Sequence, residues 1–160
     1  MKEFTFDGQR ADECVEEVVK NHPYVLFAPG LKSVLILAIP VAVLIFMGAS
    51  ATFTFVAFLS VLAVFSIFGK SYYEYSASVL IITNFRVLYL DQKGFFRRKI
   101  IETNLDKIQD VSSDTGGMLK TALDFGDLVI RTAGASTGSE IVVKNIPSPY
   151  QVQQIISKRI

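Results

Sequence analysis

The sequence contains one cysteine, Cys14, and one histidine, His22. A single cysteine excludes an intramolecular disulfide framework and a cysteine-rich metal site, and it is compatible with a reducing compartment. His22 could titrate near neutral pH, but no carboxylate, serine or thiol group accompanies it in a catalytic pattern. We therefore expect His22 to be a surface residue near a helix end, and we predict no catalytic or metal site built on either residue.

The sequence also lacks an excess of one charge, since its formal net charge is only +1. A nucleic-acid-binding protein would normally carry a clear excess of positive charge. Gly116-Gly117 is not followed by the Lys-Ser/Thr pair that a phosphate-binding loop requires. Asp106, Asp110 and Asp114 recur every four residues, but a solvated strand face explains them better than a metal site does. We expect no catalytic residues, no cofactor, no metal and no nucleic-acid partner.

Charged residues are absent from Ser33 to Gly69, a stretch that Lys32 and Lys70 close on either side. A single helix of this length would measure roughly 55 Å, well beyond a hydrocarbon core of about 30 Å. Its least hydrophobic part, Gly48 to Thr52, lies near the middle. The sequence therefore predicts a transmembrane hairpin of two helices over residues 31–70, with Lys32 and Lys70 as its membrane-flanking residues.

Each half of this stretch is short for a full crossing, which needs about 20 residues. Either neighbouring residues such as Leu31 and Tyr72 extend the helices, or the hairpin enters the bilayer without crossing it. A buried hairpin in a soluble core is a third interpretation, but the stretch lacks the polar face of such helices. Pro40 is expected to kink the first helix. Gly48 to Ala51 could pack hairpins together in a homo-oligomer, although their position favours a turn.

The positive-inside rule predicts the orientation of this hairpin. Lys32 and Lys70 flank its open side, Lys20 and Arg86 lie not far behind, and the connecting turn carries no charge. We therefore expect a multi-pass protein of the cell membrane with both termini cytoplasmic. The first apolar run is no cleavable signal, because it follows an acidic segment and a second run succeeds it at once.

Residues 1–30 form an N-terminal juxtamembrane segment in this interpretation. Ala11 to Lys20 is predicted as a short helix, with Asp12 and Glu13 in its first turn. Val15, Val18 and Val19 would share one face of it.

In residues 71–160 the long apolar runs give way to a pattern that predicts short strands separated by turns. The predicted strands are Tyr72–Thr83, Phe85–Asp91, Phe95–Glu102, Lys107–Ser113, Asp127–Thr132 and Glu140–Ile146, with a small-residue turn at Ala133–Gly138. Ser148 is expected to cap a final amphipathic helix that has Pro149 at its first position. These elements predict a small, partly open antiparallel barrel with the helix at one end.

An ordered set of short motifs resembles the bacterial pleckstrin-homology-like (PH-like) domains found next to membrane segments. The resemblance covers roughly residues 72–160, and the acidic front end and hairpin also resemble such proteins. The motifs are Phe6-Asp7-Gly8-Gln9, Ile82-Thr83-Asn84-Phe85-Arg86-Val87, Gly94, Leu105-Asp106-Lys107-Ile108-Gln109-Asp110-Val111, Leu123-Asp124-Phe125-Gly126-Asp127-Leu128-Val129-Ile130 and Ile146-Pro147-Ser148-Pro149.

The resemblance implies an α+β chain with membrane helices, in which a PH-like antiparallel barrel of seven strands is capped by a C-terminal helix. It implies no particular ligand, because this fold hosts lipid binding, peptide binding and scaffolding. The first hairpin tip, Thr83–Arg86, carries one cation, which argues against specific inositol-phosphate recognition. Lys93, Arg97, Arg98 and Lys99 are the candidate contact for lipid or a partner, although strand alternation places Arg98 opposite Arg97 and Lys99. A solvated strand face is the alternative interpretation.

These observations predict a non-enzymatic, membrane-anchored module that presents a cytoplasmic surface to anionic membrane lipids or to a protein partner of unknown identity. The alternative is a component of a membrane enzyme or transport complex. That alternative would call for an ionisable residue inside the hairpin, and the stretch from Ser33 to Gly69 has none.

Overall fold

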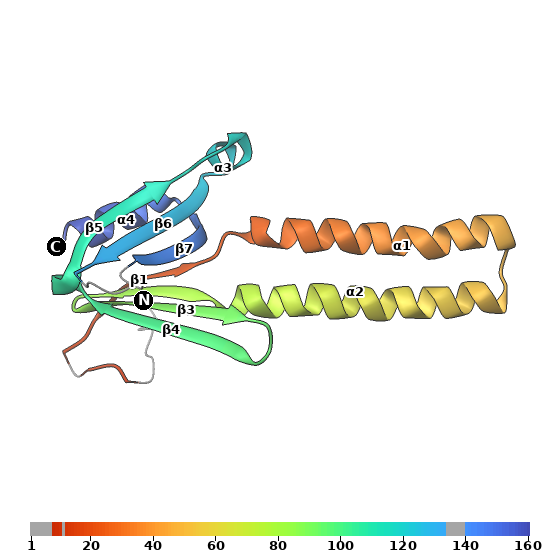
Figure 1. The fold of residues 1–160 in the computed structure, drawn as a ribbon, viewed down its shortest axis with the longest axis horizontal. Helices are drawn as coiled ribbons and strands as arrows, with labels where there is room; N and C mark the ends of the chain where they lie inside the picture. Colours follow the sequence, from red (N-terminus) through yellow and green to blue (C-terminus); the bar gives the residue numbers. More distant parts are fainter. Residues whose placement is uncertain (1–7, 11, 134–139) are drawn as a thin grey trace.

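The computed structural model describes residues 8–10, 12–133 and 140–160. Two long helices project from one end of a domain built of strands and short helices (Figure 1). The helices are α1 (Phe27–Met47), α2 (Ala51–Ala77), α3 (Met118–Ala122) and α4 (Pro149–Ser157), with short 3-10 turns η1 (Pro23–Leu26) and η2 (Leu105–Lys107). The strands are β1 (Val15–Lys20), β2 (Val79–Thr83), β3 (Arg86–Lys93), β4 (Arg97–Asn104), β5 (Ile108–Asp114), β6 (Phe125–Thr132) and β7 (Glu140–Pro147).

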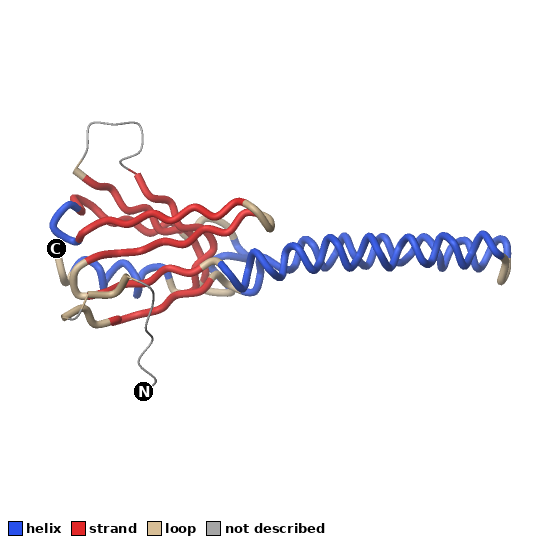
Figure 2. Tube along the Cα trace, turned by 90° about the horizontal axis from the view of Figure 1, so that it is seen from below, coloured by secondary structure: helices blue, strands red, loops and turns tan. Residues whose placement is uncertain are grey.

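The predicted turn between the two long helices is confirmed. Helix α1 ends at Met47, and its C-cap Gly48 has a φ of 67°, in the left-handed region that suits glycine. Ser50 then caps α2, since its hydroxyl accepts a hydrogen bond from the Phe53 N–H at 3.3 Å. The two helices run side by side along their length (Figures 1 and 2).

Both helices extend beyond the charge-free stretch, α1 at its start and α2 at its end. Helix α1 has 21 residues and α2 has 27, so even α1 measures roughly 31 Å at 1.5 Å per residue. The segments Pro23–Met47 and Ala51–Ala77 are long and apolar enough to cross a membrane, and only 11% and 6% of their most apolar windows is buried. These helices therefore do not form the core of a soluble domain. Their buried residues are Ser33, Pro40 and Ser60.

The domain consists of a four-stranded sheet, β1-β2-β3-β4, and a three-stranded sheet, β5-β6-β7, both antiparallel. The expected barrel is not closed. A hydrogen bond of 2.6 Å from His22 N to Asn145 O joins the chain after β1 to β7, and η2 connects β4 to β5. Strand β1 precedes the helical hairpin and β2 follows it, so that Lys20 pairs with Val79.

The core lies between the two sheets and under α4. Leu128 and Ile130 of β6 are fully buried, and Val152 and Ile156 of α4 belong to the same cluster. The Gln153 side chain fixes this helix to β5, because its amide donates to Val111 O at 2.8 Å. The predicted C-terminal capping helix is therefore confirmed.

Three local predictions are wrong. Ala11–Lys20 contains strand β1 instead of a helix, because pairing with β2 satisfies its backbone. Tyr72–Thr83 is a strand only from Val79, since α2 continues to Ala77. Ser148 has a φ of 42° and makes no side-chain cap; its hydroxyl instead donates to Asp124 Oδ2 at 2.6 Å.

Ala11 itself, Phe6 and Asp7 of the first motif, and residues 134–138 of the predicted turn lie outside the described residues.

Candidate functional site

The four predicted contact residues, Lys93, Arg97, Arg98 and Lys99, all lie on the β3–β4 hairpin. Strand β3 ends at Lys93, which pairs with Arg97 at the start of β4. Gly94 turns the chain with a φ of 70°, and the Gln92 side-chain amide donates to its carbonyl at 2.7 Å. The cations are therefore gathered at the tip of one hairpin.

Helix α2 holds this tip in place. The Glu74 carboxylate accepts a hydrogen bond from the Gly94 N–H, and the Tyr73 ring stacks on the Phe95 ring with centroids 5.3 Å apart. Lys70, one turn earlier on α2, lies 3.8 Å from the Glu74 carboxylate. The tip thus lies beside the part of α2 where the charge-free stretch ends, on the side of the domain from which both helices project (Figure 1).

The hairpin tip is apolar as well as basic. Phe95 is 57% exposed and Phe96 is completely exposed. Neither ring belongs to the hydrophobic core of the described residues. The two adjacent rings form a contiguous apolar patch, and such patches indicate candidate contact surfaces. The sequence analysis did not select the two phenylalanines. A Phe-Phe pair directly before three cations could have indicated them, because it combines apolar and basic side chains at one turn.

Strand alternation divides the cations as expected. Arg98 lines a hollow of about 380 Å³ on the outer face of the sheet, beside Ile100 and Glu102. Arg97 and Lys99 share the other face with Ile101, which packs against the core. Within the described part of the chain, the ion pairs include Lys93 with Asp91 at 3.2 Å but none with Arg97, Arg98 or Lys99. These three exposed cations are available to an outside anion.

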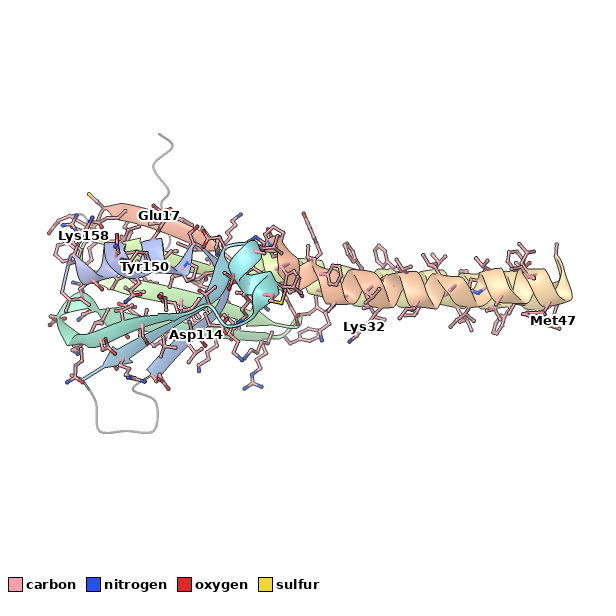
Figure 3. The ribbon with its side chains drawn as sticks, turned by 90° about the horizontal axis from the view of Figure 1, so that it is seen from above. Glu17, Lys32, Met47, Asp114, Tyr150 and Lys158 are labelled. Atoms are coloured by element: carbon pink, nitrogen blue, oxygen red, sulfur yellow. The ribbon has the colours of Figure 1, made fainter. Side chains whose placement is uncertain are left out.

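The remaining predicted residues lie elsewhere. Lys32 lies on α1 close to the domain, and Met47 marks the far end of the helical pair (Figure 3). His22 is half-buried instead of exposed: its ring stacks on Phe125 at 4.8 Å and its Nδ1 accepts from the Tyr24 N–H. Asp106 belongs to η2, apart from Asp110 on β5.

Among the described residues, no three His, Cys, Asp or Glu side chains group as metal ligands.

Arg86, the cation of the other hairpin tip, is buried and serves the fold. Its guanidinium donates to Glu13 and Glu102 and to the Gly8 carbonyl. Hydrogen bonds from Arg86 hold the pKa of Glu13 down at about 2, and the two carboxylates raise the pKa of Arg86. A phosphate group therefore has no access to this arginine at the Thr83–Arg86 turn.

Comparison with known proteins identifies the family. The bacterial PH domain family matches residues 28–160. A DUF1696 family protein with a pleckstrin-homology domain from Shewanella loihica is similar in structure over 52% of this chain and 71% of its own, with 15% identity and a TM-score of 0.41. No curated protein sequence matches the chain. Because the family match covers most of the chain, the resemblance seen in the motifs is confirmed and the protein belongs to the bacterial PH domain family.

Proposed function

We propose that this protein is a non-enzymatic, membrane-anchored PH module whose β3–β4 hairpin contacts anionic lipid head groups. One observation carries the proposal: a fully exposed Phe96, followed by the cations Arg97, Arg98 and Lys99, which are unpaired within the described residues, lies on a hairpin tip. The hydrogen bond from the Gly94 N–H to Glu74 fixes this tip to α2 just after the charge-free stretch. Membership of the PH family favours a binding module over an enzyme.

The helical pair supplies the anchor. Helix α1 is roughly 31 Å long, which suits a hydrocarbon core of about 30 Å, and most of its surface is apolar and exposed. Lys32 and Lys70 lie at the domain end of the pair, whereas the turn at the other end has no charge. The positive-inside rule then favours a cytoplasmic domain.

The hairpin tip matches the chemistry of the membrane interface. Phenylalanine is among the apolar residues that interfacial segments bury at the boundary between head groups and acyl chains, where Phe95 and Phe96 would lie. Arg97, Arg98 and Lys99 follow directly, and each cation near an anionic leaflet gains about 1 kcal/mol. The clamp between Glu74 and Gly94 supports the proposal, because it keeps the tip at a fixed height along α2.

The absence of tryptophan from the chain makes a sharp test available. Phe96→Trp creates a single tryptophan in the full-length protein, which is excited selectively over the six tyrosines. The variant is reconstituted in vesicles with brominated phosphatidylcholine or brominated phosphatidylglycerol. We expect blue-shifted emission and quenching, and stronger quenching by the anionic lipid. Emission that neither brominated lipid quenches would overturn the proposal and leave the hairpin to a protein partner.

The contribution of charge is tested in the same Phe96→Trp background. Arg97→Gln with Lys99→Gln should abolish the preference for the brominated anionic lipid. The matched control changes two exposed cations away from the tip, Lys107→Gln with Lys158→Gln, and should retain the preference. Equal behaviour of the two double variants would show that net charge, and not this hairpin, attracts the lipid.

A further inference from the structure

Helix α3 presents an apolar surface to the outside at the connection between β5 and β6. Met118 is 91% exposed, Leu119 is 59% exposed and Leu123, directly after the helix, is 47% exposed. Three large apolar side chains exposed side by side on so short an element are not needed by the core, which they do not join. Clustered apolar exposure of this kind indicates a contact surface.

The polar groups of α3 are already satisfied within the domain. Its one charged side chain, Lys120, pairs with Asp127 of β6 at 2.9 Å. The Thr121 hydroxyl donates to the Gly117 carbonyl at 3.0 Å. Burial of Met118 and Leu119 in an apolar environment would therefore leave no charged side chain of the helix without a partner.

The place of α3 in the fold indicates what covers it. Helix α3 and the β3–β4 turn both lie at the end of the domain from which the long helices project, with the bases of α1 and α2 between them (Figure 1). A hollow of about 450 Å³, lined by Met118, Leu119, Phe125 and Tyr24 among others, adjoins α3. Tyr24 stacks on Phe27, the first residue of α1, at 5.6 Å. The apolar surface is thus continuous from α3 to the membrane helix.

We propose that α3 is a second membrane contact, with Met118 and Leu119 inserted among the lipids at the level of the head groups. This inference rests on the proposed function, because the bilayer must surround α1 and α2. The exposed Asp114 lies at the end of β5 near α3 (Figure 3), so the contact is interfacial and not deep. Together, the β3–β4 tip and α3 hold the domain against the bilayer on both sides of the helical pair.

The test is Met118→Trp, again a single tryptophan in the full-length protein, in vesicles that contain brominated phosphatidylcholine. Lys158→Trp is the matched control, because Lys158 lies at the opposite end of the domain (Figure 3). We expect quenching and a blue shift for Met118→Trp and neither for Lys158→Trp. Since both positions are exposed, neither substitution disturbs the core, and circular dichroism checks the fold.

The outcomes separate this inference from the proposed function. Quenching at Phe96→Trp but not at Met118→Trp would overturn the α3 contact and leave the proposed function intact. Quenching at Met118→Trp alone would support the α3 contact and overturn the lipid role of the β3–β4 hairpin. Equal quenching at Met118→Trp and Lys158→Trp would also overturn the inference, since the whole domain would then touch lipid without a preferred face.

Discussion

The guanidinium of Arg86 makes a two-pronged contact with the carboxylate of Glu13, although 73 positions separate the two residues. Nε of Arg86 donates to Oε1 at 2.8 Å and Nη2 donates to Oε2 at 2.7 Å. Glu13 is 3% exposed and Arg86 7%. This pair fixes the chain just before β1 to the turn between β2 and β3.

Removal of one member of this pair should destabilise the domain strongly. Glu13→Ala leaves the Arg86 charge buried without its main partner, and the loss of one member of a buried pair costs about 3 to 5 kcal/mol. Urea unfolding in detergent, followed by near-ultraviolet circular dichroism, measures this cost. Glu140→Ala is the control, because it breaks only an exposed pair with Arg131 and should cost about 1 kcal/mol or less.

The same pair predicts acid sensitivity. The pKa of Glu13 is lowered from 4.5 to about 2 in the folded protein, so folding favours its ionised form. This stabilisation is complete above about pH 5 and is lost as the pH falls towards 2. The free energy of unfolding should therefore decrease over this interval in the wild type and decrease less in Glu13→Gln.

Asp127 also makes the free energy of unfolding decrease as the pH falls, by a smaller amount, and Glu13→Gln should retain this decrease. Burial acts to raise the pKa of Asp127, but hydrogen bonds from the Asn145 N–H and Lys120 outweigh burial and lower it. A slope in Glu13→Gln equal to that of the wild type would contradict the assignment of the acid sensitivity to Glu13.

Loss of the Glu74 carboxylate should release the hairpin tip from α2. Glu74→Ala removes the acceptor of the Gly94 N–H, and a hydrogen bond of this kind contributes about 1 to 3 kcal/mol. Hydrogen exchange in the peptide that contains Gly94 should accelerate. Lys70→Ala, which breaks only the exposed pair with Glu74, should leave that exchange rate nearly unchanged.

Gly126 should not tolerate a side chain. A Cβ at this position of β6 would lie 2.4 Å from the Asp114 carbonyl oxygen and 3.1 Å from Pro149, so Gly126→Ala must push β6 away from the end of β5 and from the start of α4. Overpacking of this kind costs about 1 to 3 kcal/mol. Gly116→Ala is the control, since its nearest neighbour would be 3.6 Å away; equal melting temperatures for the two variants would contradict the prediction.

Local patterns in the sequence were sufficient for most of the strands and for the C-terminal helix. The turn at Asn84, the glycine turn at Gly94 and the amphipathic spacing from Val152 all lie where they were expected. The helical hairpin was recognisable because charge is absent over a long stretch. Such signals are readable because each depends on residues close together in the chain.

Contacts between residues far apart in the chain could not be predicted from the sequence. Val15, Val18 and Val19 fit a helical face as well as a strand, and only pairing with β2 decides for the strand. Similarly, α2 continues past Tyr72 because its C-terminal end packs on the β3–β4 hairpin. At the candidate site, the four cations could be selected from the sequence, whereas the clamp through Glu74 depends on the folded arrangement.

The insertion of α1 and α2 between paired strands bears on the order of folding. Lys20 and Val79 are hydrogen-bonding neighbours on β1 and β2, yet the whole helical pair separates them in the chain. Closure of so long a flexible loop would cost conformational entropy. Two antiparallel helices reduce this cost, because their packing places the start of α1 next to the end of α2. Because β2 follows α2 in the chain, the β1–β2 ladder cannot be completed during synthesis until the second helix has emerged.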